Sequence, residues 1–254
     1  MMGELMFSDK MKTRLMGLAL AGAALAIPGA ASAGVVVKSS GPSSGEYPVG
    51  RQVADDASIT LRAGDRITVL TDGGTRVMQG PGTFRVGEGA TRTRARFSNL
   101  TRRRAARRVR TGAVRSGDAS GPVRSPNLWF VNVAAAGNMC LYDLGTVRLW
   151  RPQASEAQTY RISDTASENS LDVTFVESEA VRALDPNGVP ITDGGNYTIS
   201  APASGETSAS SVNVKFVTLV EDYATPDALA QALFENGCTT QLALLADTLE
   251  ASVQ

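Results

Sequence analysis

Hydrophobic and polar positions alternate in short runs along most of the chain. Between residues 58 and 86 these runs are separated by glycine-containing turns at Gly64-Asp65, Gly73-Gly74 and Gly80-Pro81-Gly82. Alternation with a period of two indicates strands with one buried face, and glycine and aspartate are typical of the tight turns between them. The pattern predicts a small module of antiparallel strands over residues 34–90.

A second series of strand-like runs begins at residue 128 and continues to residue 220. The runs read LWFVNV, TVRLWR, TYRI, LDVTFV, YTIS and VNVKFVTLV, and their spacing is typical of an antiparallel sandwich. Helical signals occur at the end, where Pro226 opens one predicted helix, Gly237 closes it, and a second helix follows. The fold class is therefore predicted as mainly β, with a sandwich module over residues 125–254 that carries two C-terminal α-helices.

The first 33 residues have the order of segments found in a secretory signal peptide. Lys12 and Arg14 precede an apolar run, and the small residues of Ala31-Ser32-Ala33 follow it. The run is short for a membrane-spanning helix, so an uncleaved anchor is the less favoured interpretation. We expect cleavage between Ala33 and Gly34, a periplasmic or secreted mature protein, and no transmembrane segment after cleavage.

The turns of the first strand module also suggest a family. The stretch LRAGDRITVLTDGGTRVMQGPGTFRV resembles the FecR-type domain of bacterial envelope proteins, through its Gly-Asp, Gly-Gly and Gly-Pro-Gly turns. The resemblance covers about residues 50–86 and implies a β fold and an envelope location. It identifies no active site, and the regulatory role of membrane-bound members is not carried over because the chain shows no spanning helix or cytoplasmic segment for a sigma factor.

A second resemblance lies near the end of the predicted sandwich. The stretch PITDGGNYTIS, residues 190–200, looks like the Pro-x-x-x-Gly-x-x-Tyr entry to a strand in Ig-like modules. It implies that the module over residues 125–254 is an Ig-like β-sandwich.

The composition removes several kinds of catalytic site. The chain has no histidine, which excludes Ser-His-Asp and Cys-His catalysis and the commonest metal ligand. Ser43 lies in a formal G-x-S-x-G match, but it has no histidine base and no strand–turn–helix context. We expect no catalytic residue, metal or cofactor. The alternative that stays open is a pair of carboxylates acting as an enzyme on envelope glycans.

Two cysteines, Cys140 and Cys238, are available for a disulfide. Without histidine they do not complete a structural zinc site, and an even number of cysteines in an oxidising compartment favours a bond between them. Such a bond would hold the C-terminal helices against the sheet. The alternative is two buried, unpaired thiols.

The arginine-rich segment, residues 91–124, is the strongest charge feature. It contains eleven arginines and one aspartate, whereas residues 125–254 contain five basic and sixteen acidic residues. We predict a linker that is disordered or partly helical, because charge blocks of this kind repel themselves. The residues that would contact an anion are Arg102, Arg103, Arg104, Arg107, Arg108 and Arg110.

Three partners would neutralise this segment: the acidic C-terminal module, an anionic envelope polymer or lipid headgroup, and nucleic acid. Nucleic acid is not expected, because the predicted location and the near absence of aromatic residues among the arginines argue against it. The sequence thus predicts a non-catalytic exported envelope protein that acts as a binding, scaffolding or regulatory module. Its partner, an unknown protein or an envelope polymer, is not identified by any motif.

Overall fold

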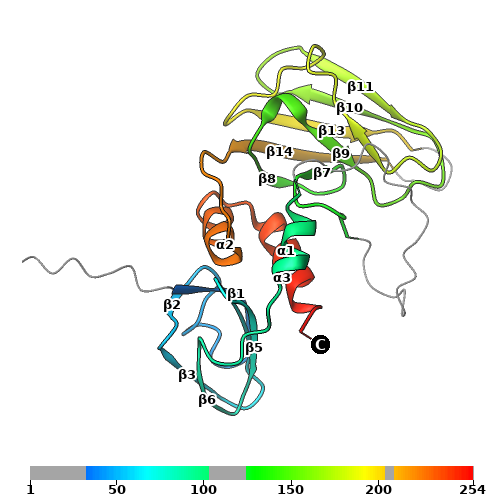
Figure 1. Cartoon of the computed structure of the whole chain (residues 1–254). Coiled ribbons are helices and arrows are strands. Elements are labelled where there is room, and N and C mark those ends of the chain that lie inside the picture. The colour runs from blue at the N-terminus through cyan, green and yellow to red at the C-terminus, as the bar shows by residue number, and fades with distance from the viewer. Residues whose placement is uncertain (1–32, 103–123, 204–208, 254) are drawn as a thin grey trace, which may run out of the picture. The chain divides into compact units, whose positions relative to one another are not determined.

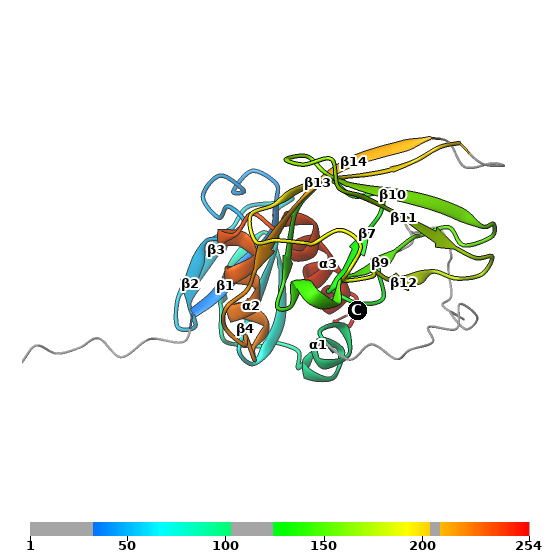
Figure 2. The same ribbon diagram turned by 90° about the horizontal axis from the view of Figure 1, so that it is seen from above.

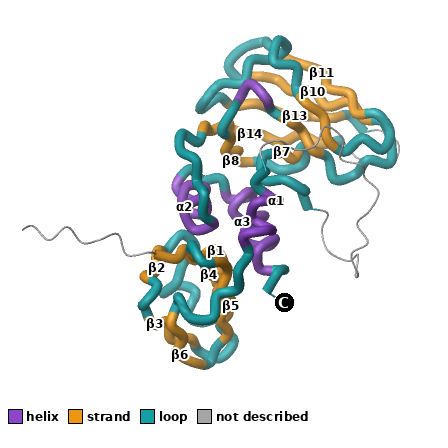
Figure 3. The backbone as a smooth tube through the Cα atoms, viewed as in Figure 1, coloured by secondary structure: helices purple, strands orange, loops and turns teal. Residues whose placement is uncertain are grey.

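The computed structural model describes residues 33–102, 124–203 and 209–253. These residues form a mainly β protein with three α-helices, two of them at the C-terminal end, as the sequence predicts. Strands, orange in Figure 3, make up most of the regular structure. The predicted signal peptide, apart from Ala33, lies outside the described residues.

The N-terminal sheet has four antiparallel strands in the order β2-β1-β4-β5 (Figure 1). Its strands are β1 (Ala33–Ser40), β2 (Gln52–Ala54), β4 (Arg66–Thr71) and β5 (Gly74–Gln79). A separate pair, β3 (Ser58–Leu61) with β6 (Gly82–Arg85), shares an apolar core with this sheet. The core includes Val36, Val69 and Ile59, all of them buried.

The Gly-Asp turn of the N-terminal module has a clear structural role. Asp65 is buried, and its carboxylate accepts hydrogen bonds from the backbone N–H of Ser43 (2.8 Å) and of Arg62 (2.6 Å). Gly64 has a φ of +87°, a conformation that favours glycine. The turn therefore fixes the loop after β1 against the loop before β4, which is a structural task rather than a catalytic one.

The second β region, called here the sandwich, has two sheets. The larger has the order β11-β10-β13-β14-β8 and the smaller has the order β12-β9-β7. Figure 2 shows β10, β11, β13 and β14 on one side and β7, β9 and β12 on the other. The larger sheet consists of β8 (Gly137–Leu141), β10 (Gln158–Asp164), β11 (Ser170–Phe175), β13 (Asn196–Ala201) and β14 (Ser210–Thr218). The smaller consists of β7 (Phe130–Asn132), β9 (Arg148–Trp150) and β12 (Val181–Ala183), and a 3-10 turn, η1 (Leu144–Thr146), precedes β9.

Side chains of both sheets form one core. It contains Leu149 from the smaller sheet together with Ile162, Phe175 and Phe216 from the larger one. Most strand pairs are antiparallel, but β14 pairs with β8 and β7 pairs with β9 in parallel. The expected antiparallel sandwich is therefore mixed at these two pairs.

The Pro-x-x-x-Gly-x-x-Tyr stretch closes a turn at the edge of the sandwich core. The Tyr197 hydroxyl donates a hydrogen bond to the carbonyl oxygen of Pro190 (2.8 Å) and accepts one from the N–H of Thr192 (3.0 Å). The ring is buried and packs edge-on against Phe216, with 5.4 Å between the ring centroids. A buried tyrosine that binds the backbone a few residues upstream is the arrangement of a tyrosine corner in Ig-like sandwiches.

The three helices are α1 (Arg94–Leu100), α2 (Pro226–Glu235) and α3 (Thr239–Glu250). Proline occupies the first turn of α2, and Gly237, with a φ of +67°, follows its last turn. These are the signals from which the sequence predicts the beginning and end of this helix. The two C-terminal helices are confirmed.

The packing of α2 and α3 differs from the expected division into two modules. The helices share a core with Val35 and Leu70 of the N-terminal sheet as well as with Leu128 and Cys140 of the sandwich region. The two helices therefore cover apolar side chains of the N-terminal sheet as well as of the sandwich region. The physical reason lies in β4, which is buried on both faces, so that the sheet needs a second apolar cover.

Candidate functional site

The arginine-rich segment is described only at its two ends. Arg102 is exposed, and its Nη2 donates a hydrogen bond to Asn99 Oδ1 (3.0 Å). Arg124, at the other end, is also exposed. The remaining arginines of the predicted anion-contacting set lie outside the described residues, namely Arg103, Arg104, Arg107, Arg108 and Arg110.

Helix α1 anchors the first end of this segment in the core. Phe97 and Leu100 are buried in the cluster that also contains the C-terminal helices. After the helix, the Thr101 carbonyl accepts a hydrogen bond from Trp129 Nε1 (2.7 Å), and the Arg102 carbonyl accepts one from Asn127 Nδ2 (2.9 Å). The two ends of the segment are therefore held close together. The sequence signal for this anchor was the apolar pair at a helical spacing of three within a run of arginines.

We use the name cationic face for four exposed arginines on and beside α1, namely Arg92, Arg94, Arg96 and Arg102. All four side chains are exposed. Within the described ranges, none of them lies within the 4.0 Å ion-pair distance of a carboxylate oxygen. A cavity of about 470 Å³ adjoins Arg92 and Arg94, and Asp72 is the one acidic residue among its lining side chains. These arginines are therefore exposed cations, and Asp72 is the acidic side chain that lines the same cavity as Arg92 and Arg94.

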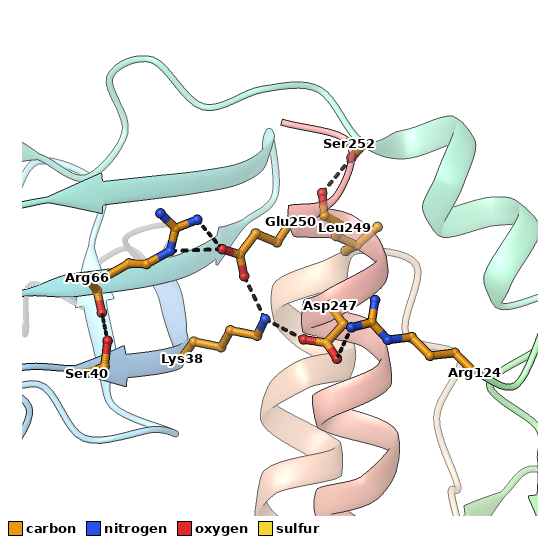
Figure 4. Close-up of polar contacts among 8 residues, drawn as sticks. All are labelled: Lys38, Ser40, Arg66, Arg124, Asp247, Leu249, Glu250 and Ser252. Atoms are coloured by element: carbon orange, nitrogen blue, oxygen red, sulfur yellow. Dashed lines mark hydrogen bonds and ion pairs between the residues drawn. The ribbon is translucent and has the colours of Figure 1, made fainter. Parts of the chain in front are cut away.

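Arg124 belongs to a different arrangement, the ion-pair cluster, which consists of Lys38, Arg66, Arg124, Asp247 and Glu250 (Figure 4). Glu250 accepts hydrogen bonds from Lys38 Nζ (2.7 Å) and from Arg66 Nε (3.2 Å). Asp247 pairs with Arg124 (3.2 Å) and also with Lys38. The cluster joins the last turns of α3 to β1 and β4. The sequence analysis did not predict it.

Burial and ion pairing act in opposite directions on the cluster. Burial raises the pKa of the Glu250 carboxyl, but hydrogen bonds and charge from Lys38 and Arg66 outweigh it, and the pKa lies below its ordinary value. Burial lowers the pKa of the Lys38 ammonium, but Asp247 and Glu250 outweigh it, and the pKa lies above its ordinary value. Both groups are thus held in their charged forms.

An apolar groove lies between α3 and the strands β7 and β8. Its volume is about 230 Å³, and its lining includes Leu128, Met139, Val214 and Leu244. Arg124 and Asp247 also line it, so the groove and the ion-pair cluster share these two residues. The sequence analysis gave no indication of this groove, because its walls come from segments far apart in the chain.

The predicted disulfide is present between Cys140 and Cys238. The two Cα atoms are 6.0 Å apart, and both side chains are fully buried. Gln241 supports the junction, because its Oε1 accepts a hydrogen bond from the Cys140 N–H (2.7 Å) while its Nε2 donates to the Cys140 carbonyl (2.9 Å) and to the Leu128 carbonyl (3.0 Å). The bond attaches the beginning of α3 to β8.

The described residues offer little that resembles an active site. Ser43 is buried in the turn held by Asp65 and does not lie on a strand–turn–helix elbow. The carboxylates of Asp247 and Glu250 share the Lys38 ammonium, and each is held by cations. Over the described ranges, no group of three or more histidine, cysteine, aspartate or glutamate side chains is placed to hold a metal ion.

No family model, curated protein or solved structure matches the chain. In the part of the chain that the structure describes, no helix has the length and apolar character needed to cross a membrane.

Proposed function

We propose that this protein is an exported, non-catalytic binding module of the bacterial envelope that contacts an anionic envelope polymer through its arginine-rich segment. The single observation that carries the proposal is the cationic face, whose arginines stand exposed without carboxylate partners among the described residues. Unneutralised charge at this density attracts anionic polymers over the range of the Debye length.

The anchoring of α1 also supports a binding role. A free connector needs no buried side chains, yet Phe97 and Leu100 fix the first turns of the arginine-rich segment in the core. Fixing these turns reduces the conformational entropy that binding would otherwise cost. Among the described residues, Arg124 of the segment forms an ion pair with Asp247 of the C-terminal region.

Export is part of the proposal. The buried disulfide is of the kind that persists in an oxidising compartment. The resemblance of residues 50–86 to the FecR-type domain supports an envelope location as well. We infer that the polymer is a polysaccharide that carries phosphate, sulfate or carboxylate groups. The oxygen atoms of such groups accept paired hydrogen bonds from the planar guanidinium group of arginine.

Mass spectrometry of the exported protein is expected to find Gly34 as the first residue. In the structure the Ala33–Gly34 bond lies within β1, where Gly34 pairs with Val53. We therefore expect signal peptidase to cleave this bond only before β1 pairs with its neighbouring strands. A side chain at position 34 would require the Val69 side chain to shift, because a Cβ there would lie 2.6 Å from Val69 Cγ1. An exported chain that begins at Met1 or Met11 would contradict the export part of the proposal.

Binding to immobilised dextran sulfate, with uncharged dextran as the reference polymer, tests the cationic face. We expect the triple variant Arg92→Gln, Arg94→Gln, Arg96→Gln to bind about tenfold more weakly than the wild type, since each lost contact at an exposed site contributes about 0.5 kcal/mol. Raising the salt concentration from about 0.05 M to about 0.2 M should weaken the wild type further.

The matched control is the triple variant Arg62→Gln, Arg85→Gln, Arg182→Gln. It removes the same net charge from exposed positions outside the cationic face. We expect it to bind within about twofold of the wild type, because the position of the charges then matters more than their sum. Equal losses in the two variants, or a wild type that does not bind at low salt, would refute the role of the cationic face.

A further inference from the structure

The cavity beside the turn between β4 and β5 is lined by two arginines of the cationic face. Across the described ranges, neither Arg92 nor Arg94 lies within the 4.0 Å ion-pair distance of a carboxylate oxygen. Asp72 is the acidic residue of the cavity wall, so the charges that line the cavity sum to +1 (two arginines and one aspartate). Asp227, in the first turn of α2, does not line it. A cavity with this charge attracts an anion.

The backbone that carries these arginines is fixed against the same turn. Thr75 and Thr91 exchange two backbone hydrogen bonds, of 3.0 and 2.9 Å. The hydroxyl oxygens of Thr75 and Thr93 lie 3.3 Å apart, and both side chains are buried. Gly74 permits this approach, because a Cβ at that position would overlap the carbonyl oxygen of Thr91. Arg92 therefore lies between two anchored residues, which reduces the conformational entropy that binding would cost.

The opposite wall of the cavity comes from the beginning of α2. Ala224, Thr225 and Pro226 line it there, and Phe97 of α1 is a buried apolar part of the wall. The Thr225 side chain makes no hydrogen bond to the first turn of its helix, so its hydroxyl is a further polar group for a ligand. The volume of about 470 Å³ lies within the range of small-molecule sites, about 300–1,000 Å³.

Asp72 limits the anions that this cavity accepts. A carboxylate repels a group whose oxygen atoms carry no proton near neutral pH, such as a sulfate monoester, a phosphodiester or another carboxylate. A phosphate monoester differs, because its second proton has a pKa of about 6 and can be shared with a neighbouring carboxylate. Its other oxygen atoms then accept hydrogen bonds from guanidinium groups.

We propose that the cavity binds a phosphate monoester on a sugar unit of the anionic polymer, with Arg92 and Arg94 as donors to its oxygen atoms and Asp72 as the acceptor of its proton. The inference rests on the proposed function, because it narrows the charged groups of the polymer to one. The cavity should therefore prefer a phosphate monoester to a sulfate monoester of the same sugar.

An NMR titration of the full mature protein with glucose 6-phosphate tests the proposal, with glucose 6-sulfate as the matched probe. The amide signals of Gly73 and Gly74 should shift on addition of the phosphate, since both residues line the cavity. We expect the phosphate to bind about fivefold more tightly than the sulfate. In Asp72→Asn the repulsion is removed, so the two probes should bind within about twofold of each other.

Single variants separate the cavity from the rest of the cationic face. Arg92→Gln and Arg94→Gln should each weaken glucose 6-phosphate about fivefold, because each removes a charge-assisted donor. Arg96→Gln is the comparison within the face, since Arg96 does not line the cavity, and it should weaken binding less than about twofold. Lys215→Gln removes a positive charge from an exposed position of the sandwich and is the control outside the face. The amide spectrum of each variant shows whether it is folded.

The outcomes separate this inference from the proposed function. Losses confined to Arg92→Gln and Arg94→Gln, with shifts at Gly73 and Gly74, support the cavity. Equal losses in Arg96→Gln, or equal binding of the two probes to the wild type, would overturn it. Arginine-dependent binding of dextran sulfate without any response to glucose 6-phosphate would overturn this inference and leave the proposed function standing. Binding of glucose 6-phosphate in the cavity by a protein that does not bind dextran sulfate would reject the proposed function alone.

Discussion

Replacing Cys140 and Cys238 together by alanine is expected to lower the free energy of unfolding by about 3–5 kcal/mol. The bond joins residues 98 positions apart, and in the chain-entropy model a closed loop of this size restricts the unfolded chain by about 4–5 kcal/mol. The double variant also removes two buried sulfur atoms from the core around α3. Denaturant unfolding of both proteins measures the difference.

The wild type in the presence of a reductant is the matched control for this variant. Its stability should fall to a value close to that of the double variant, and the double variant itself should not respond to the reductant. Since the described chain holds no free cysteine, no exchange with another thiol complicates the comparison. A loss below about 1 kcal/mol would mean that the contacts of Gln241 and the apolar core hold α3 in place without the bond.

The substitution Glu250→Gln is expected to lower the free energy of unfolding by about 2 kcal/mol. Removing one partner of a fully buried ion pair costs about 3–5 kcal/mol, and the expected loss of stability lies below this range because the side chains of Lys38 and Arg66 are partly exposed. The Glu250 side chain is 8% exposed, whereas those of Lys38 and Arg66 are 40% and 35% exposed. Glu88→Gln, which breaks the exposed pair with Arg85, should cost less than about 0.5 kcal/mol.

The pH dependence of this difference follows from the two pKa shifts. The pKa of Glu250 is lowered in the folded state, so its contribution is present above the ordinary value of 4.5 and is lost as the pH falls through the folded-state pKa. The pKa of Lys38 is raised, so its contribution is present below the ordinary value of 10.5 and is lost as the pH rises through its folded-state pKa. The wild type and Glu250→Gln should therefore differ most between about pH 4.5 and 10.5, and converge in acid. A difference that persists unchanged at pH 2 would contradict the ion-pair explanation.

Local patterns predicted most of the secondary structure. Alternation in SITL and RITVLT corresponds to β3 and β4, and Pro226 and Gly237 mark the limits of α2. The disulfide was also predicted from the sequence. The chain has two cysteines and no histidine, so the cysteines cannot complete a structural zinc site. These features depend on neighbouring residues or on simple counting.

The features that the sequence did not predict all depend on distant contacts. Lys38 is separated from Glu250 by 212 positions, and in the sequence it appears as an ordinary polar residue of a strand. The groove combines residues from 124 to 247, which become neighbours only when the chain folds. The alternating pattern also predicted one buried face for β4, whereas both faces are buried. Leu70, on the second face, packs in the same core as the C-terminal helices.

The cover that α2 and α3 provide for the N-terminal sheet affects how the chain reaches its native state during synthesis. Val35 and Leu70 emerge early, but the helices that bury them begin only at Pro226, 156 residues after Leu70 (226 − 70). At about 5–20 residues per second, the ribosome needs roughly 8–30 s to make this interval. For that time the N-terminal sheet lacks the helices that bury Val35 and Leu70, and exposed apolar surface of this kind makes a partly made chain prone to aggregation.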